Sequence, residues 1–258
     1  MASPSGDYVL QLSDLMAQST GALVRSPSHS RRAEARRRLA LHSLWLVAGL
    51  SALIIVLMFV FDATEITLMP KRGSQDLWPL RILTDFGKDA YVLLALAAAF
   101  AVSVLAYPLA RSRLRPALTR LAIRVQYFFL AVALPVFVTE AIKWIVGRGR
   151  PFVGGKADAF NFVPFTGTEA YFSFPSAHAV TAFALAFGIA AIWPRWWAAA
   201  FAYALLIAAS RLVLLAHHPS DVVGGALIGI VGAMAVRYWF AARRVGFDIK
   251  DGGKIVPL

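Results

Sequence analysis

Long apolar stretches separated by short polar segments dominate the chain. Each stretch holds roughly 17–23 residues, close to the ~20 that an α-helix needs to cross the hydrocarbon core of a bilayer. Proline and glycine occur inside some of them, as is tolerated where helices pack closely in a membrane. The pattern predicts an all-α, polytopic membrane bundle of six transmembrane helices in a single domain, residues 39–240. We place the helices near 39–61, 90–108, 121–142, 177–193, 196–215 and 220–240.

The polar segments at both ends are expected to be tails outside this domain. Residues 1–38 end in an arginine-rich run and lack the apolar region and cleavage site of a signal peptide. We predict a disordered basic tail there, and a second tail at 241–258. The alternative is a helix on the bilayer surface, because apolar side chains recur at helical spacing at Tyr8, Leu12, Leu15 and Met16.

Composition agrees with a membrane protein and excludes several other classes. Hydrophobic residues make up 59% of the chain and charged residues only 16%, a balance unlike that of soluble domains. The chain has no cysteine, which excludes disulfides, thiolate nucleophiles and cysteine-bound metals. The net charge is +12, but the basic residues form short clusters between apolar stretches. We therefore expect the bilayer as a partner and no nucleic acid.

The distribution of Lys and Arg predicts which helix ends face the cytoplasm. Of the 26 basic residues, 17 lie in or beside the two tails and the loops after the second and fourth helices. Positive residues accumulate on the cytoplasmic side, so both termini are expected there. The outer loop 62–89 has five acidic and four basic side chains and looks like an ordinary solvated loop. The other two outer segments carry charges at helix ends on the disfavoured side, which indicates a function.

The first of three polar motifs is KWIVGRGRP, at the outer end of the third helix. Lys143 and Arg150 lie about two helical turns apart, and two fixed cations so placed suit a phosphate group. Basic residues at helix ends also serve as interfacial anchors, so this motif alone leaves both roles open. Glu140 is expected to pair with Lys143 or Arg211 and orient it, or to form a simple structural ion pair.

The second motif is FPSAHAV, residues 174–180. Ser176 follows a proline and precedes an apolar run, which is the position of a helix N-cap, and His178 falls in the first turn. The free N–H groups and the positive end of the helix dipole at such a terminus attract anions. The alternative is a plain cap beside a structural histidine.

The third motif is SRLVLLAHHPSD. Ser210 and Arg211 lie in the outer half of the fifth helix, and Arg211 offers a planar fork of donors for phosphate oxygens. His217 and Asp221 flank the start of the sixth helix. A carboxylate four residues after an imidazole can hold one ring nitrogen and leave the other more basic. An interfacial histidine and a capping aspartate are the alternative, but three such motifs on one face favour a phosphate site.

The three motifs resemble those of the type 2 phosphatidic acid phosphatase family, which is related to bacterial acid phosphatases and vanadium haloperoxidases. The family pattern is Lys, six residues and Arg-Pro; then Pro-Ser-Gly-His; then Ser-Arg, five residues, His, three residues and Asp. Ten of its eleven fixed positions match here, in order and with the spacings kept. The departure is Ala177 in place of Gly. We expect Ala177 in the first turn of a helix, where its methyl group costs almost nothing.

The resemblance implies a role for most of these residues. His217 looks like the nucleophile that takes the phosphoryl group as a phosphohistidine, with Asp221 orienting it. His178 is similar to the general acid that protonates the leaving alkoxide. The groups that would bind phosphate are Lys143, Arg150, Ser176, Ala177 and Arg211. Ser210 matches the motif without an assigned role, and no metal or other cofactor is expected because the cations already neutralise the phosphate.

We therefore expect a lipid phosphatase that removes a terminal phosphate from a lipid phosphate or diphosphate at the periplasmic side of a bacterial inner membrane. A phosphotransferase with the same phosphohistidine would carry the same motifs. A non-enzymatic transporter or scaffold is a further alternative, although transporters usually place polar groups near the midplane. The lipid is open among phosphatidate, phosphatidylglycerol phosphate, undecaprenyl diphosphate and lipid A phosphate, as is the oligomeric state. The aromatic loop 152–174 is expected to guide a lipid chain or to form an interfacial belt.

Overall fold

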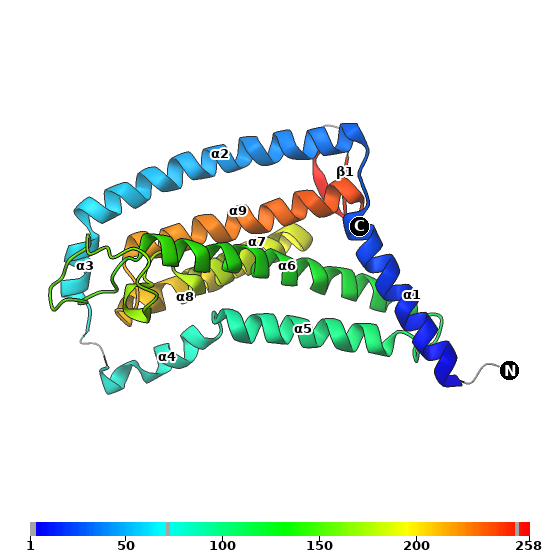
Figure 1. Ribbon diagram of the computed structural model, residues 1–258, viewed down its shortest axis with the longest axis horizontal. Helices are drawn as coiled ribbons and strands as arrows, with labels where there is room; N and C mark the ends of the chain where they lie inside the picture. Colours follow the sequence, from blue (N-terminus) through cyan, green and yellow to red (C-terminus); the bar gives the residue numbers. More distant parts are fainter. Residues whose placement is uncertain (1–3, 71–72, 251–252) are drawn as a thin grey trace.

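The computed structural model describes residues 4–70, 73–250 and 253–258 and consists mostly of helices (Figure 1). Small parts of both predicted tails and residues 71–72 of the first outer loop lie outside the described residues. The longer helices are α1 (Pro4–Val24), α2 (His29–Val60), α5 (Asp89–Ala106), α6 (Arg115–Val146), α7 (Ala177–Ile192), α8 (Trp197–Val213) and α9 (Pro219–Arg243). The shorter ones are α3 (Asp62–Leu68), η1 (Gln75–Leu77), α4 (Trp78–Asp85), η2 (Glu169–Tyr171) and η3 (Pro194–Trp196). Two antiparallel strands, β1 (Phe247–Ile249) and β2 (Ile255–Pro257), follow α9.

Within the described residues, five helical segments are long and apolar enough to cross a membrane, and they correspond to five of the six predicted spans. They are His29–Val60, Gln75–Ala106, Arg115–Val146, Pro194–Val213 and Pro219–Arg243. The remaining predicted span corresponds to α7, which is apolar but has only 16 residues. Such a helix is about 24 Å long, against a hydrocarbon core of about 30 Å. It ends early because Pro194 disfavours helical backbone in the residue before it.

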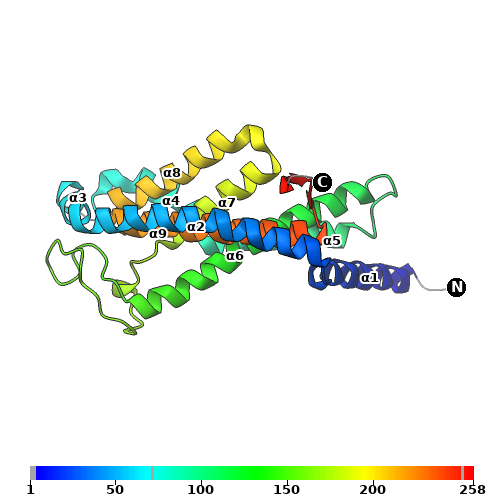
Figure 2. The same cartoon turned by 90° about the horizontal axis from the view of Figure 1, so that it is seen from above.

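Helix α7 lies at the centre of the bundle, packed against α6, α8 and α9 (Figures 1 and 2). Its small apolar side chains are buried. Two glycines of α9 allow the closest approach: a Cβ at Gly225 would collide with the carbonyl oxygen of Ser176, and one at Gly229 with that of Val180. These contacts fit the predicted close packing and hold the start of α7 against the start of α9.

The two ends of the bundle are built differently. Helix α1 and the β1–β2 hairpin lie at one end, whereas α3, α4 and the loop 147–176 lie at the other (Figures 1 and 2). The N-terminal helix and the C-terminal strands therefore share one end. The three polar motifs lie at the opposite end.

The N-terminal segment differs from the expected disordered tail. Its first part forms α1, in agreement with the alternative prediction of a helix, and α2 begins at His29 within the arginine-rich run. Arginine, alanine and glutamate favour helical backbone, so the run extends the first span. Contacts hold both helices in place: the Tyr8 hydroxyl donates to the Leu105 carbonyl, and Arg31 Nη2 lies 2.6 Å from Asp248 Oδ1.

Candidate active site

Lys143 and Arg150 lie on either side of the end of α6. The helix ends at Val146 because Gly147 adopts a left-handed φ of +54°, which glycine accepts without steric cost. A side chain at Gly147 would also collide with the carbonyl of Val163. Arg150 therefore lies in the loop after α6, and both cations face the same outer end of the bundle.

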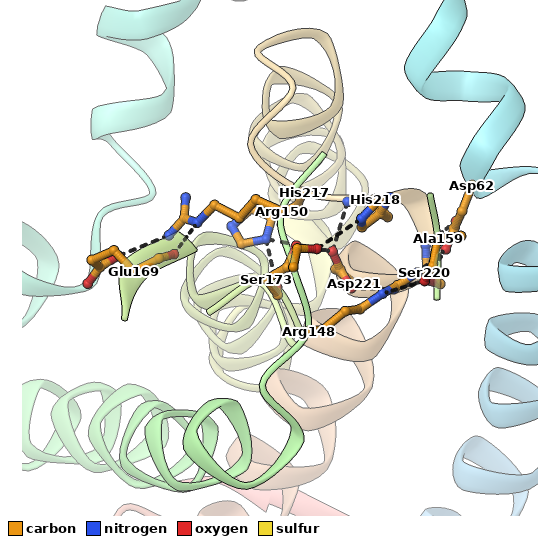
Figure 3. Close-up of polar contacts among 11 residues, drawn as sticks. Asp62, Arg148, Arg150, Ala159, Glu169, Ser173, His217, His218, Ser220 and Asp221 are labelled. Atoms are coloured by element: carbon orange, nitrogen blue, oxygen red, sulfur yellow. Dashed lines mark hydrogen bonds and ion pairs between the residues drawn. The ribbon is translucent and has the colours of Figure 1, made fainter. Parts of the chain in front are cut away.

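Each of these two cations has a carboxylate partner. Lys143 Nζ lies 2.7 Å from Glu140 Oε1, which confirms one of the two pairings expected for Glu140. Arg150 donates from Nε to the Glu169 carbonyl at 2.9 Å and pairs through Nη2 with the Glu169 carboxylate at 3.1 Å (Figure 3). The Glu169 side chain is 86% exposed, so an anionic ligand can displace it from Arg150.

The second motif forms the start of α7. Ser176 is the N-cap residue, as predicted, and it is fully buried. Its hydroxyl makes no capping hydrogen bond and finds no partner within residues 4–70, 73–250 and 253–258. Ala177 is the first helical residue, which confirms the predicted position in the first turn, and His178 follows it. A buried hydroxyl beside the free N–H groups of a helix N-terminus is a good binding position for an anion.

The two polar residues of α8 differ in what they contact. Arg211 donates from Nη1 to the Thr84 hydroxyl at 2.9 Å, so α4 in the first outer loop also contributes to the site. Ser210 instead donates to the Ile207 carbonyl at 2.6 Å within α8. The hydroxyl of Ser210 thus stabilises its own helix.

His217 lies in the turn between α8 and α9 and is 3% exposed. Its Nδ1 lies 2.7 Å from the carbonyl oxygen of Ser173 (Figure 3). Because a carbonyl oxygen only accepts hydrogen bonds, Nδ1 carries the proton and Nε2 keeps its lone pair. Nε2 is therefore the nitrogen that can act as a nucleophile.

The expected hydrogen bond between Asp221 and His217 is not present. Their Oδ2 and Nδ1 atoms lie 3.9 Å apart. The Ser173 hydroxyl and the His218 backbone N–H donate to Asp221 Oδ2 instead, at 2.6 and 2.8 Å (Figure 3). Asp221 is the third residue of α9, and its carboxylate reaches back to cap the helix. It therefore acts on His217 through Ser173 and through its charge.

Burial and positive charge keep His217 neutral. Burial lowers the pKa of His217 well below its usual value, and three nearby cations lower that pKa further. The cations are Arg211, Arg150 and Lys143. The same three cations, together with Lys88, act electrostatically on His178. The structure thus brings the basic residues of the separate motifs together around both histidines, with His217 in its neutral form at neutral pH.

Arg148 and Asp62 are the main residues of the site that the sequence analysis missed. Arg148 is 1% exposed and pairs with Asp62 at 2.8 Å and with Asp221 at 2.5 Å (Figure 3). The assignment of Asp62 to a solvated loop was wrong, because α3 turns back onto α9 and buries the side chain completely. The available signal was that Arg148 is a second arginine of GRGRP, in a segment predicted to lie on the side where basic residues are disfavoured.

Glu65 is another buried acid of the same segment. Its side chain is 2% exposed, and neither carboxyl oxygen has a hydrogen-bond partner in the part of the chain that the structure describes. Burial, together with the charges of Asp62 and Asp221, raises the pKa of Glu65 to about 7. The same two aspartates hold Arg148, so the ionisation of Glu65 adds negative charge beside that ion-pair cluster.

Glu65→Gln is expected to reduce the pH dependence of stability. The ordinary pKa of Glu65 is 4.5 and the folded value about 7, so between these values the folded state keeps a proton that the unfolded chain loses. Relative to alkaline pH, this proton stabilises the folded state by up to about 3 kcal/mol. The full amount is present below pH 4.5, and it is lost as the pH rises through about 7. Thermal unfolding in detergent measures this. The Tm of Glu65→Gln minus the Tm of wild type should increase from acidic to mildly alkaline pH. If this difference in Tm is the same at every pH, the prediction is contradicted.

The arrangement as a whole suits phosphoryl transfer. It combines a neutral imidazole with a free Nε2, three converging cations, a buried hydroxyl at a helix N-terminus and a second histidine. Among the residues in the described ranges, no group of three or more His, Asp or Glu side chains is placed to hold a metal ion.

Comparison with known proteins gives a consistent picture. Residues 124–244 match the family model of the PAP2 superfamily. A lipid A 1-phosphatase of Rhizobium johnstonii is 28% identical over 205 residues, which is 78% of this chain and 82% of that protein. A lipid A 1-phosphatase of Rhizobium etli is 31% identical over 144 residues, 50% of this chain and 62% of that protein. The putative undecaprenyl-diphosphatase YbjG of Escherichia coli is 33% identical over 112 residues, which is 42% of this chain and 52% of that protein. No solved structure matched the chain.

Proposed function

We propose that the chain is a membrane lipid phosphatase of the PAP2 superfamily, which hydrolyses a terminal phosphate through a phosphohistidine on His217. Residues 124–244 match the family model, and two relatives are named lipid A 1-phosphatase. The observation that carries this proposal is the hydrogen bond from His217 Nδ1 to the Ser173 carbonyl. It leaves Nε2 free in a site with three cations. Lys143, Arg150 and Arg211, with Ser176 and the N–H groups that begin at Ala177, would bind the phosphate oxygens.

The first step forms a bond between Nε2 and phosphorus while the bond from phosphorus to the lipid oxygen breaks. In the complex the negative charge of the bound phosphate offsets the nearby cations and stabilises the protonated form of His178, which donates its proton to that leaving oxygen. The imidazole then carries a positive charge, which the Asp221 carboxylate stabilises from 3.9 Å. The cations neutralise the charge that develops on the phosphoryl oxygens.

The second step consumes water. A water molecule attacks phosphorus, His178 takes one of its protons, and the bond from phosphorus to Nε2 breaks. Inorganic phosphate leaves, and His217 returns to its neutral form with the proton on Nδ1. All groups of the site are then as they were before the first step.

The site is proposed to face the periplasm of a bacterial inner membrane, with both termini in the cytoplasm. Two observations support this orientation. The excess of Lys and Arg lies at the end that holds both termini, and the named relatives are bacterial. A substrate with its tail in the outer leaflet would present its phosphate at the level of the loop 147–176. Four phenylalanines of that loop are exposed and offer apolar contacts to a lipid: Phe152, Phe160, Phe162 and Phe165.

Lipid A is the first substrate to test, because two relatives are named lipid A 1-phosphatase. Undecaprenyl diphosphate comes second, from the name of YbjG. We expect the detergent-purified protein to release inorganic phosphate from at least one of these two lipids, at a higher rate than from phosphatidate or phosphatidylglycerol phosphate. A folded protein that releases phosphate from none of the four lipids would refute hydrolysis. Label that moves into a second lipid would indicate phosphotransfer instead.

A further inference from the structure

Asp62 lies outside the three motifs. It is the first residue of α3, just after the end of α2, yet its side chain is part of the site. It accepts hydrogen bonds from the Ser220 backbone N–H at 3.0 Å and from the Ser220 hydroxyl. It also accepts one from Arg148 Nη2 at 2.8 Å, although the two residues are 86 positions apart. Asp62 precedes the region 124–244 that matches the family. The outer end of α2 therefore supplies a charged group to the candidate active site.

Arg148 connects Asp62 to Asp221. Its Nη2 donates to Asp62, and its Nη1 donates to Asp221 Oδ1 at 2.5 Å (Figure 3). Nε and Nη2 also donate to the carbonyl of Ala159, at 3.1 and 2.7 Å. A planar guanidinium held on several sides has little rotational freedom. Arg148 therefore determines where the Asp221 carboxylate lies.

Ser173 carries this constraint to His217. The Ser173 hydroxyl donates to Asp221 Oδ2 at 2.6 Å, and its backbone N–H donates to the Arg148 carbonyl at 3.0 Å. Its own carbonyl accepts the proton of His217 Nδ1 at 2.7 Å. The residue that orients the imidazole is thus held at two points, once by Asp221 and once by Arg148.

We infer that Asp62 and Arg148 are positioning residues for His217. Together they fix Asp221 and Ser173, and so the direction of Nε2 and the ring nitrogen that carries the proton. This inference rests on the proposed role of His217 as the nucleophile. Nε2 must meet phosphorus in line with the leaving oxygen, so a small rotation of the ring lowers the rate of attack. The phosphate itself is bound by the three cations, and the affinity for substrate should change little.

Asp62→Asn tests the inference because it keeps the size of the side chain and removes its charge. We expect kcat to fall by about 10- to 100-fold, with KM changed by less than about 2-fold. The formation of phosphohistidine from ³²P-labelled substrate in a single turnover should slow by the same factor. Arg148→Lys should likewise lower kcat and leave KM nearly unchanged, because one ammonium group cannot bridge two carboxylates as a guanidinium does. The double variant should lose little more than either single variant, since the two residues act as a unit.

Asp248→Asn is the matched control. Asp248 also pairs with an arginine, Arg31 at 2.6 Å, but at the opposite end of the bundle (Figure 1). This control is expected to lower the Tm and leave kcat unchanged. If Asp62→Asn lowers the Tm while its kcat stays equal to that of the control, the cluster is only structural and the inference is overturned.

The outcomes also separate this inference from the proposed function. Wild-type protein that forms no phosphohistidine would refute the proposed function. Wild-type protein that forms it at the same rate as both variants would refute only the positioning role of Asp62 and Arg148. If Asp62→Asn does not fold, the comparison of kcat with KM in Arg148→Lys decides the question by itself.

Discussion

Replacement of His217 by alanine is expected to abolish phosphate release, with kcat falling by about 10⁴-fold or more. Nε2 of His217 is the atom that would bond to phosphorus, whereas Ser173 and Asp221 orient the ring and form no bond to phosphorus. Initial rates of phosphate release from the best lipid substrate measure the loss. Trapping with ³²P-labelled substrate gives the direct evidence: an acid-labile, alkali-stable label should appear on wild-type protein and be absent from the variant.

His218→Ala is the matched control for this prediction. His218 is the next residue and is also buried, but its Nε2 lies 3.2 Å from the carbonyl of Gly149, which makes that nitrogen a donor. The pKa of His218 is lowered, mainly by burial. The variant should keep most of the activity and the label. A phosphorylated His217→Ala protein would contradict the assignment of the nucleophile.

Residues whose positions follow from local backbone rules could be predicted from the sequence. A serine before an apolar run marks a helix N-cap, and Ser176 is the N-cap of α7. Pro219 marks the first turn of a new helix, and α9 begins there. Because both helices begin at the same end of the bundle, the order of the motifs was enough to place His178 and His217 in one site.

Long-range pairing could not be predicted in the same way. Nothing in the residues around Asp62 distinguishes it from the other acids of the first outer loop. Its burial depends on α3 folding back onto α9, and on Arg148, which is far away in sequence. The indirect link from Asp221 to His217 has the same origin. The spacing of four residues permits a direct contact, but the cap of α9 and the hydroxyl of Ser173 hold the carboxylate elsewhere.

The lengths of the apolar stretches predicted the candidate spans, but not the polar residues that extend the helices beyond them. The arginine-rich run at the start of α2 reads as a tail, because charged residues are costly in the bilayer core. In the structure the same residues continue the helix beyond the apolar part and pair with the C-terminal hairpin. The apolar stretch of α7, in contrast, ends at Ile192 and falls short of a full span. Neighbouring helices bury most of its side chains, so its own contact with lipid is limited.

Replacement of His178 by alanine is expected to lower kcat by about 10²- to 10⁴-fold on the proposed substrate lipid A, and by less than about 10-fold on p-nitrophenyl phosphate. The 1-phosphate of lipid A leaves behind a sugar hydroxyl, a poor leaving group that needs a proton as the bond to phosphorus breaks. Nitrophenolate leaves readily without one. Steady-state rates of the variant and of wild type on both substrates measure the difference.

The dependence on the leaving group separates acid catalysis by His178 from simple binding of phosphate. Loss of a phosphate-binding group would lower the rate on every phosphate ester by a similar factor, because the transferred phosphoryl group is the same in each. The loss of kcat on undecaprenyl diphosphate should lie between the losses on the other two substrates. Its leaving group is a lipid phosphate, which needs less protonation than a sugar hydroxyl. His42→Ala serves as the control, because His42 contacts the hydroxyl of Tyr238 at 2.8 Å, away from the site. Equal losses on all three substrates would assign His178 to phosphate binding and leave the proton donor to another group.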